Sequence, residues 1–144
     1  MQRTFLTILT ALLSLVFIGC GEGGPKTTPV SITITQKGTP LAGAAVTMVS
    51  ADGNSAAGMT NDSGVAVMEM TGSSTKKGAV PGEYGVGVRK WEIREIPNPS
   101  EDAPDATSSV REDKLPRKYG DIGESGFKLT VGTTAVVETF DIPE

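Results

Sequence analysis

Apolar and polar residues alternate with a period of two along most of the chain beyond residue 29. Val30, Ile32 and Ile34 alternate with serine and threonine, the pattern of a strand with one buried face. Turn-forming residues separate similar runs, and no run has the period of a helix. We expect these apolar faces to form the core: Ala44, Val46, Met48, Ala66, Met68, Met70, Tyr84, Val86, Val88, Phe127, Leu129, Val131, Val136, Phe140 and Ile142. The pattern predicts an all-β fold, a β-sandwich of six or seven short strands.

Two stretches depart from this pattern. Residues 96–113 contain three prolines and many small or acidic residues without an apolar period, which predicts a surface loop excursion. In the last strand, Glu138 is in phase with Val136 and Phe140. Because a lone carboxylate facing a core is costly, we expect a bulge or an edge strand there.

The first twenty residues have a different composition. Arg3 precedes an almost wholly apolar run, Phe5–Ile18, and Gly19–Cys20 closes the segment. This layout predicts a cleaved secretory signal over residues 1–19. An uncut membrane anchor is the alternative, although its length is marginal for a bilayer span, and an ordinary signal with an incidental cysteine is another. Residues 20–29 are rich in Gly, Pro and Thr and predict a flexible tether before one domain at residues 30–144.

The segment Phe17-Ile18-Gly19-Cys20 resembles the lipobox of bacterial lipoproteins, with Phe17 where leucine is usual. The resemblance implies cleavage between Gly19 and Cys20, a diacylglyceryl group on the Cys20 sulfur, and usually acylation, such as palmitoylation, of the freed amine. Two or more acyl chains make anchoring effectively permanent. We therefore expect a lipid-anchored protein of the bacterial cell envelope. Gly21 stands where aspartate commonly signals inner-membrane retention, which favours the outer membrane in a Gram-negative cell.

Composition narrows the possible chemistry. The chain has no histidine and one cysteine, so the commonest general base and metal ligand are missing and no intramolecular disulfide can form. Of its 13 basic residues Arg3 lies in the signal, leaving 12 against 17 acidic residues and no basic stripe. We therefore expect no catalytic residue, no metal, no cofactor and no nucleic-acid partner.

Several motifs of the body resemble a carboxypeptidase regulatory-like domain. They are the run from Gly38 to Val46 (GTPLAGAAV), the turn Thr60–Gly64 (TNDSG) and the strand entry Pro81–Val86 (PGEYGV). Leu115–Tyr119 (LPRKY), followed by Ser125–Phe127 (SGF), resembles the C-terminal part of a bacterial lipoprotein subgroup. The resemblance implies a seven-stranded, Greek-key, transthyretin-like (prealbumin-like) sandwich.

Three functions remain open on the sequence. The first is a non-catalytic module that contacts another envelope protein through sheet edges or the proline-rich loop. The second is carbohydrate binding, for which Trp91 and Tyr119 are the candidate ligand contacts; Trp91 is alternatively a plug over one end of the sandwich. The third is a calcium-stabilised adhesion domain using the oxygen-rich turns near Asp52, Asn61 and Asp102, although none has the spacing of a calcium-binding loop.

Overall fold

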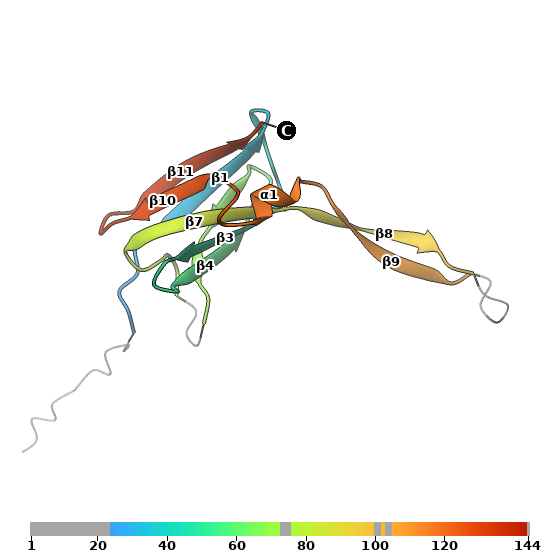
Figure 1. Ribbon diagram of the computed structural model, residues 1–144, viewed down its shortest axis with the longest axis horizontal. Helices are drawn as coiled ribbons and strands as arrows, with labels where there is room; N and C mark the ends of the chain where they lie inside the picture. Colours follow the sequence, from blue (N-terminus) through green and yellow to red (C-terminus); the bar gives the residue numbers. More distant parts are fainter. Residues whose placement is uncertain (1–23, 73–75, 100–101, 103–104, 144) are drawn as a thin grey trace, which may run out of the picture.

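The computed structural model describes residues 24–72, 76–99, 102, 105–143. These residues form an all-β body of two sheets and a separate two-stranded hairpin (Figure 1). The predicted signal peptide, the cleavage between Gly19 and Cys20, and the lipidation of Cys20 lie outside the described residues. Within the described part, no helix is long and apolar enough to cross a membrane.

The first sheet is built around β1 (Val30–Gln36). β11 (Val136–Ile142) runs parallel to β1 along its whole length, while β2 (Thr39–Pro40) and β5 (Val65–Val67) pair antiparallel with its other edge. Lys37 and Gly38 both have positive φ, 51° and 76°, which is the geometry of a type I′ hairpin turn between β1 and β2. This tight turn sets the register of the sheet edge.

The second sheet has five strands, and all its neighbours are antiparallel. Their order is β10 (Phe127–Val131), β7 (Gly82–Arg89), β3 (Ala45–Ser50), β4 (Ser55–Met59) and β6 (Glu69–Met70). The described residues thus contain eleven strands with those of the hairpin, against six or seven expected. The difference comes from β2 and β6, which have two residues each, and from the hairpin.

The predicted core positions lie between the two sheets in one apolar cluster. Ile32 and Ile34 from the first sheet are fully buried, as are Val46 and Val86 from the second. Met70, Phe127, Val136 and Phe140 are only partly buried, because they lie toward the margins of the sheets. The period-two prediction of the core is therefore confirmed, and apolar burial on this scale is the main stabilising contribution to the fold.

The turn before β5 is capped by Asn61, whose Oδ1 accepts the N–H groups of Ser63 and Val65 at 2.9 and 3.1 Å. Gly64 follows with a positive φ of 75°. The last strand tests the prediction made for Glu138. Glu138 is exposed on β11, which is an edge strand, so the edge prediction is confirmed. There the carboxylate reaches solvent and accepts the N–H of Thr139.

Residues 96–113 do not form the irregular loop that the sequence predicted. Half of them lie in the strands of an antiparallel hairpin, β8 (Trp91–Pro97) and β9 (Thr107–Asp113). Both faces of this hairpin are exposed to solvent, so no buried face imposes an apolar period on its sequence. These residues do extend away from the body, but most of the described ones lie in β-strands.

The segment between β9 and β10, residues 114–126, covers the outer face of β7. It contains the one-turn helix α1 (Arg117–Gly120), and we call it the α1 segment. Two glycines of β7 allow this close contact. A Cβ on Gly85 would lie 2.4 Å from Cγ2 of Ile122, and one on Gly87 would lie 3.0 Å from the carbonyl oxygen of Gly120. The segment therefore lies directly on the sheet, beside the base of the hairpin.

Candidate functional site: the hairpin and the groove at its base

The hairpin continues directly from β7 and extends away from the body (Figure 1). Its strands pair from Trp91 with Asp113 to Pro97 with Thr107. The N-terminal segment before β1, blue in Figure 1, lies at the other end of the body. Any contact made by the hairpin is therefore made on the side away from this N-terminal segment.

Apolar side chains are exposed on both faces of the hairpin. Strand alternation places Ile93 on the same face as Trp91 and Arg111, and Ile96 with Val110 on the opposite face. The exposed fraction is 71% for Ile93, 40% for Val110 and 36% for Ile96. Among the described residues, β8 and β9 pair only with each other, so each has one free edge. Free backbone edges beside exposed apolar side chains can pair with another chain.

Ion pairs of Lys114 join the two strands at the base of the hairpin. The Lys114 Nζ lies 3.2 Å from a carboxylate oxygen of Glu92 and 3.4 Å from one of Glu112, on the two strands. The Lys114 N–H donates to the carbonyl of Lys90 at 2.8 Å. The hydrogen bond to Glu92, and the charge of Glu112, raise the pKa of Lys114 above its ordinary value. This lysine therefore stays charged and bridges both strands where they leave the sheet.

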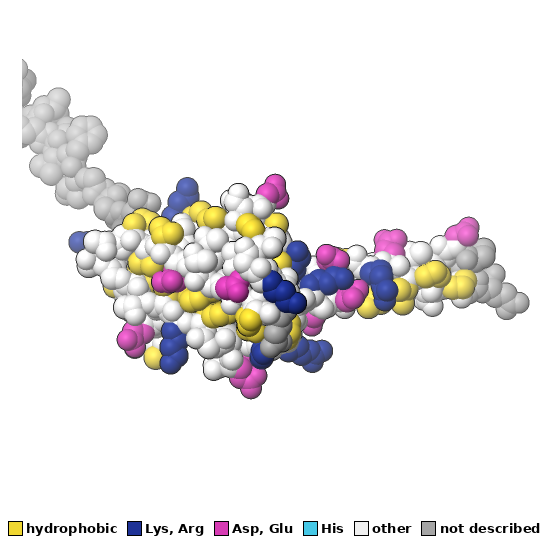
Figure 2. Space-filling view, turned by 90° about the horizontal axis from the view of Figure 1, so that it is seen from above, with side chains coloured by type: hydrophobic (Ala, Val, Ile, Leu, Met, Phe, Trp, Pro, Cys, Tyr) yellow, Lys and Arg dark blue, Asp and Glu magenta, His cyan; other side chains and the backbone are white. Residues whose placement is uncertain are grey.

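A groove lies between the hairpin base, the outer face of β3 and β7, and the α1 segment; we call it the junction groove. Its volume is about 650 Å³. Four basic residues line it, Arg89, Lys90, Arg111 and Arg117, with Asp113 the one acidic residue of the lining. Lys and Arg side chains gather on the surface where the hairpin leaves the body (Figure 2). In a chain of net charge −4, this is a local concentration of positive charge.

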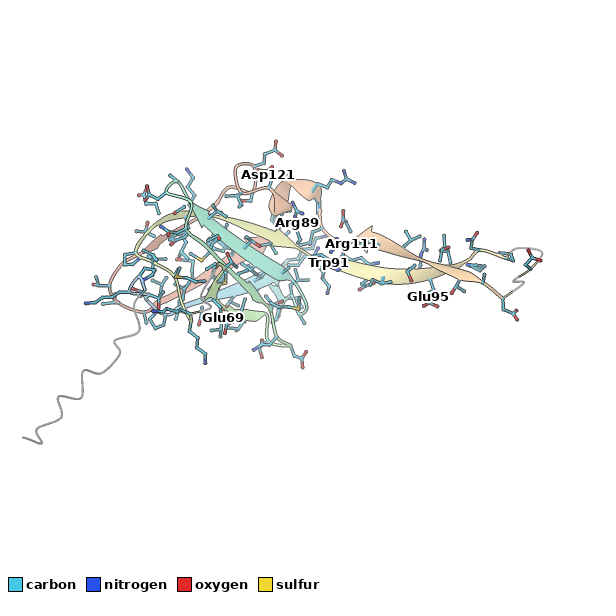
Figure 3. The ribbon with its side chains drawn as sticks, turned by 90° about the horizontal axis from the view of Figure 1, so that it is seen from below. Glu69, Arg89, Trp91, Glu95, Arg111 and Asp121 are labelled. Carbon is cyan, nitrogen blue, oxygen red and sulfur yellow. The ribbon has the colours of Figure 1, made fainter. Side chains whose placement is uncertain are left out.

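Two of the arginines are held in defined positions. The guanidinium carbon of Arg111 lies 3.8 Å from the centre of the Trp91 ring, a cation–π contact between the two hairpin strands. The Arg89 Nε–H donates to the Gly120 carbonyl at 3.4 Å. Figure 3 shows Arg89, Trp91 and Arg111 together at the junction, with Glu95 farther out along the hairpin. The third arginine, Arg117, is looser, with Nε 3.9 Å from an Asp113 oxygen.

The structure separates the two aromatic residues that the sequence proposed as a ligand site. Trp91 is partly exposed and lines the junction groove, but Arg111 covers one face of its ring. Tyr119 is 5% exposed and stacks on Phe127 with ring centres 5.8 Å apart. The expectation that Tyr119 is an exposed ligand contact is wrong, because the α1 segment folds its ring onto β10. Trp91 alone remains at the candidate site.

Sequence reasoning missed the arginines of the junction groove. Arg89 and Arg111 are far apart in the sequence and meet only because the hairpin register brings β9 back beside the end of β7. Within the ranges that the structure describes, no group of three or more acidic or cysteine side chains is placed to hold a metal ion.

No protein-family model matches the chain, and no curated protein matches it. A crystal structure of BcpA, the major pilin subunit of Bacillus cereus, is similar with a TM-score of 0.44 and 12% sequence identity. The alignment covers 83% of this chain and 31% of BcpA, so the chain spans about a third of that protein's length.

Proposed function

We propose that the chain is a lipid-anchored, non-catalytic module of the bacterial cell envelope that binds a protein partner through the β8–β9 hairpin. The observation that carries this proposal is the hairpin itself, which protrudes from the body with free edges and exposed Ile93, Ile96 and Val110. A two-stranded hairpin is marginally stable alone, and exposed apolar side chains on it favour association. A surface of this kind is better suited to a contact than to support of the core.

The positions of the anchor and the hairpin are consistent with this function. The lipobox resemblance gives Cys20 an attachment role, and the predicted tether of residues 20–29 would join the body to the membrane up to Thr28, which already pairs with Ala79 in the body. Because the hairpin lies at the end of the body away from the N-terminal segment before β1, it would point away from the bilayer (Figure 1). The resemblance to carboxypeptidase regulatory-like domains supports the body as a scaffold that holds the hairpin.

The mode of contact that we infer is strand addition. An extended segment of the partner would pair with the free edge of β8 or β9, and its side chains would contact Ile93 or Val110. Backbone pairing supplies affinity, while the exposed side chains supply selectivity. The carbohydrate alternative has less support, because Tyr119 is buried and Arg111 occupies one face of Trp91.

The first test concerns the anchor. Cys20→Ser should move the protein out of the membrane fraction and remove the lipid mass from its N-terminus in mass spectrometry. Retention of the variant in the membrane with unchanged mass would contradict lipid anchoring through Cys20.

The second test concerns the partner. Cross-linking in intact cells followed by pull-down of the full chain should recover one reproducible partner, and Ile93→Lys should abolish the recovery. Met59→Lys is the matched control, because Met59 is 63% exposed but lies on β4 of the body. The proposal fails when the wild type recovers no partner or when Ile93→Lys recovers it as well as Met59→Lys does.

A further inference from the structure

We propose that the junction groove binds an acidic peptide segment, with Arg89 and Arg111 holding its carboxylates. This inference rests on the proposed function, because it names the chemistry of the segment that a protein partner would present. The groove would thus bind the carboxylates of the partner at the hairpin base, while the hairpin strands pair with the partner's backbone farther out.

Positive charge exceeds negative charge in the lining of the groove. Arg89, Lys90, Arg111 and Arg117 face one carboxylate, Asp113, and that carboxylate is 3.9 Å from Arg117. Like charges gathered in a partly enclosed space repel one another and attract anions. The uncompensated charge favours a ligand that carries more than one negative group.

The arginines are positioned before any ligand arrives. The stacking of Arg111 on Trp91 fixes the plane of the guanidinium but uses none of its N–H donors. None of the described residues accepts a hydrogen bond from these N–H groups. Arg89 uses Nε on Gly120, which leaves its two terminal nitrogens for a carboxylate. A positioned guanidinium loses less conformational freedom on binding and can hold a carboxylate through two hydrogen bonds.

Gly120 is part of this arrangement. A Cβ at this position would lie 2.6 Å from Nε and 2.7 Å from Cγ of Arg89. Any side chain at residue 120 would therefore force the Arg89 side chain to shift. Glycine there leaves room for Arg89 to lie against this turn, where the Gly120 carbonyl accepts its Nε–H.

The lining of the groove favours a peptide over an anionic polysaccharide. Part of this lining is apolar, with Leu115, Pro116 and Ile122 facing it from the α1 segment. On the same hairpin face, Ile93 lies directly across from Arg111, its cross-strand partner. Alternating carboxylate and apolar side chains of an extended peptide fit such a surface. A sugar ring would instead need an open aromatic face, and Arg111 covers one face of Trp91.

Trp91 provides the measurement, because it is the chain's one tryptophan. The full chain in a nonionic detergent is titrated with a peptide of alternating glutamate and valine, and its fluorescence and calorimetric heat are followed. We expect saturable binding that weakens at least tenfold in 0.5 M NaCl, since the contact is between charges. The same peptide with glutamine for glutamate should bind at least tenfold more weakly.

Matched arginine variants locate the contact. Arg89→Gln and Arg111→Gln should each reduce the calorimetric affinity at least tenfold. Arg94→Gln should leave it unchanged, because Arg94 lies on the opposite hairpin face. Equal unfolding midpoints among the variants would show that the fold is intact. Equal affinity of all three variants would place the peptide elsewhere and overturn the inference.

Two further outcomes would also overturn it. Binding of polygalacturonate but not of the acidic peptide would assign the groove to anionic polysaccharide. Binding of neither would leave the charge without this role. The pull-down separates this inference from the proposed function: a partner lost in Ile93→Lys but retained in Arg89→Gln and Arg111→Gln supports the function and removes the peptide site. Peptide binding without any recovered partner would support the peptide site and remove the proposed function.

Discussion

The body and the hairpin use the same secondary structure for opposite purposes. In the body, β1, β3 and β7 each bury one face, and Ile32, Ile34 and Val46 have no exposed surface. In the hairpin, Ile93 is 71% exposed and neither face is covered. The body therefore derives its stability from apolar burial, whereas the hairpin depends on its backbone pairing and on the ion pairs of Lys114 at its base.

This difference indicates where substitutions affect stability and where they affect function. Side chains of the body are constrained by packing, so their loss should cost folding free energy. Side chains of the hairpin are free of that constraint, so their loss should weaken the binding of a partner and leave the fold intact. Paired substitutions in the two regions test this division directly.

The largest expected contrast is between two isoleucines. Ile34→Ala should lower the free energy of unfolding by about 3 kcal/mol, because it leaves a cavity in the core. Ile93→Ala should change it by less than about 0.5 kcal/mol, because the side chain is already in water. Urea unfolding of the purified full chain measures both. A loss for Ile93→Ala close to that for Ile34→Ala would show that the hairpin is packed and would remove the distinction.

The same contrast explains how much of the fold the sequence could predict. Alternation identified the buried faces of β1, β3 and β7 because a buried face requires apolar residues at every second position. The hairpin carries no such requirement, so its prolines and acidic residues indicated a loop. Glu138 was correctly placed on an edge, because the cost of burying a carboxylate can be read from the pattern alone.

The candidate site was harder to predict. Trp91 was noticed as an aromatic residue outside the core pattern, but its partner Arg111 lies on the other hairpin strand. Without the hairpin register, nothing in the sequence brings Arg111 or Arg89 beside Trp91. Tyr119 was misplaced for a related reason: its burial depends on the α1 segment lying on the glycine face of β7, which the local sequence does not specify.

A smaller contrast is expected between two threonines. In the body, the buried Thr60 hydroxyl donates to the Leu41 carbonyl at 2.6 Å and accepts the Ala44 N–H at 2.8 Å. Thr60→Val should cost about 2 kcal/mol, because both buried backbone groups lose their partner. In the hairpin, the Thr107 hydroxyl has an exposed contact of 3.5 Å to Glu95. Thr107→Val should cost less than about 0.5 kcal/mol by urea unfolding, and equal losses would contradict the division.

The smallest contrast concerns two exposed carboxylates and the response to acid. The Asp141 carboxylate accepts hydrogen bonds from the Thr35 hydroxyl at 2.6 Å and the Gly38 N–H at 2.8 Å, which lower its pKa below the ordinary value of 3.8. A pKa lowered by folding adds stability that is present above the unfolded-state pKa and is lost as the pH falls through the folded-state pKa. Glu95 on the hairpin has only the long contact to Thr107.

Asp141→Asn should therefore lower the urea midpoint at pH 6, and the gap from the wild type should narrow as the pH falls below about 4. Glu95→Gln should leave the urea midpoint at pH 6 unchanged, because its carboxylate has only the long, exposed contact to Thr107. Circular dichroism at a series of pH values follows the Asp141→Asn gap, and the same measurement at pH 6 gives the Glu95→Gln midpoint. A gap for Asp141→Asn that stays constant to pH 3 would assign its effect to hydrogen-bond geometry instead of charge. A lowered midpoint for Glu95→Gln at pH 6 would mean that this hairpin side chain contributes to folding stability.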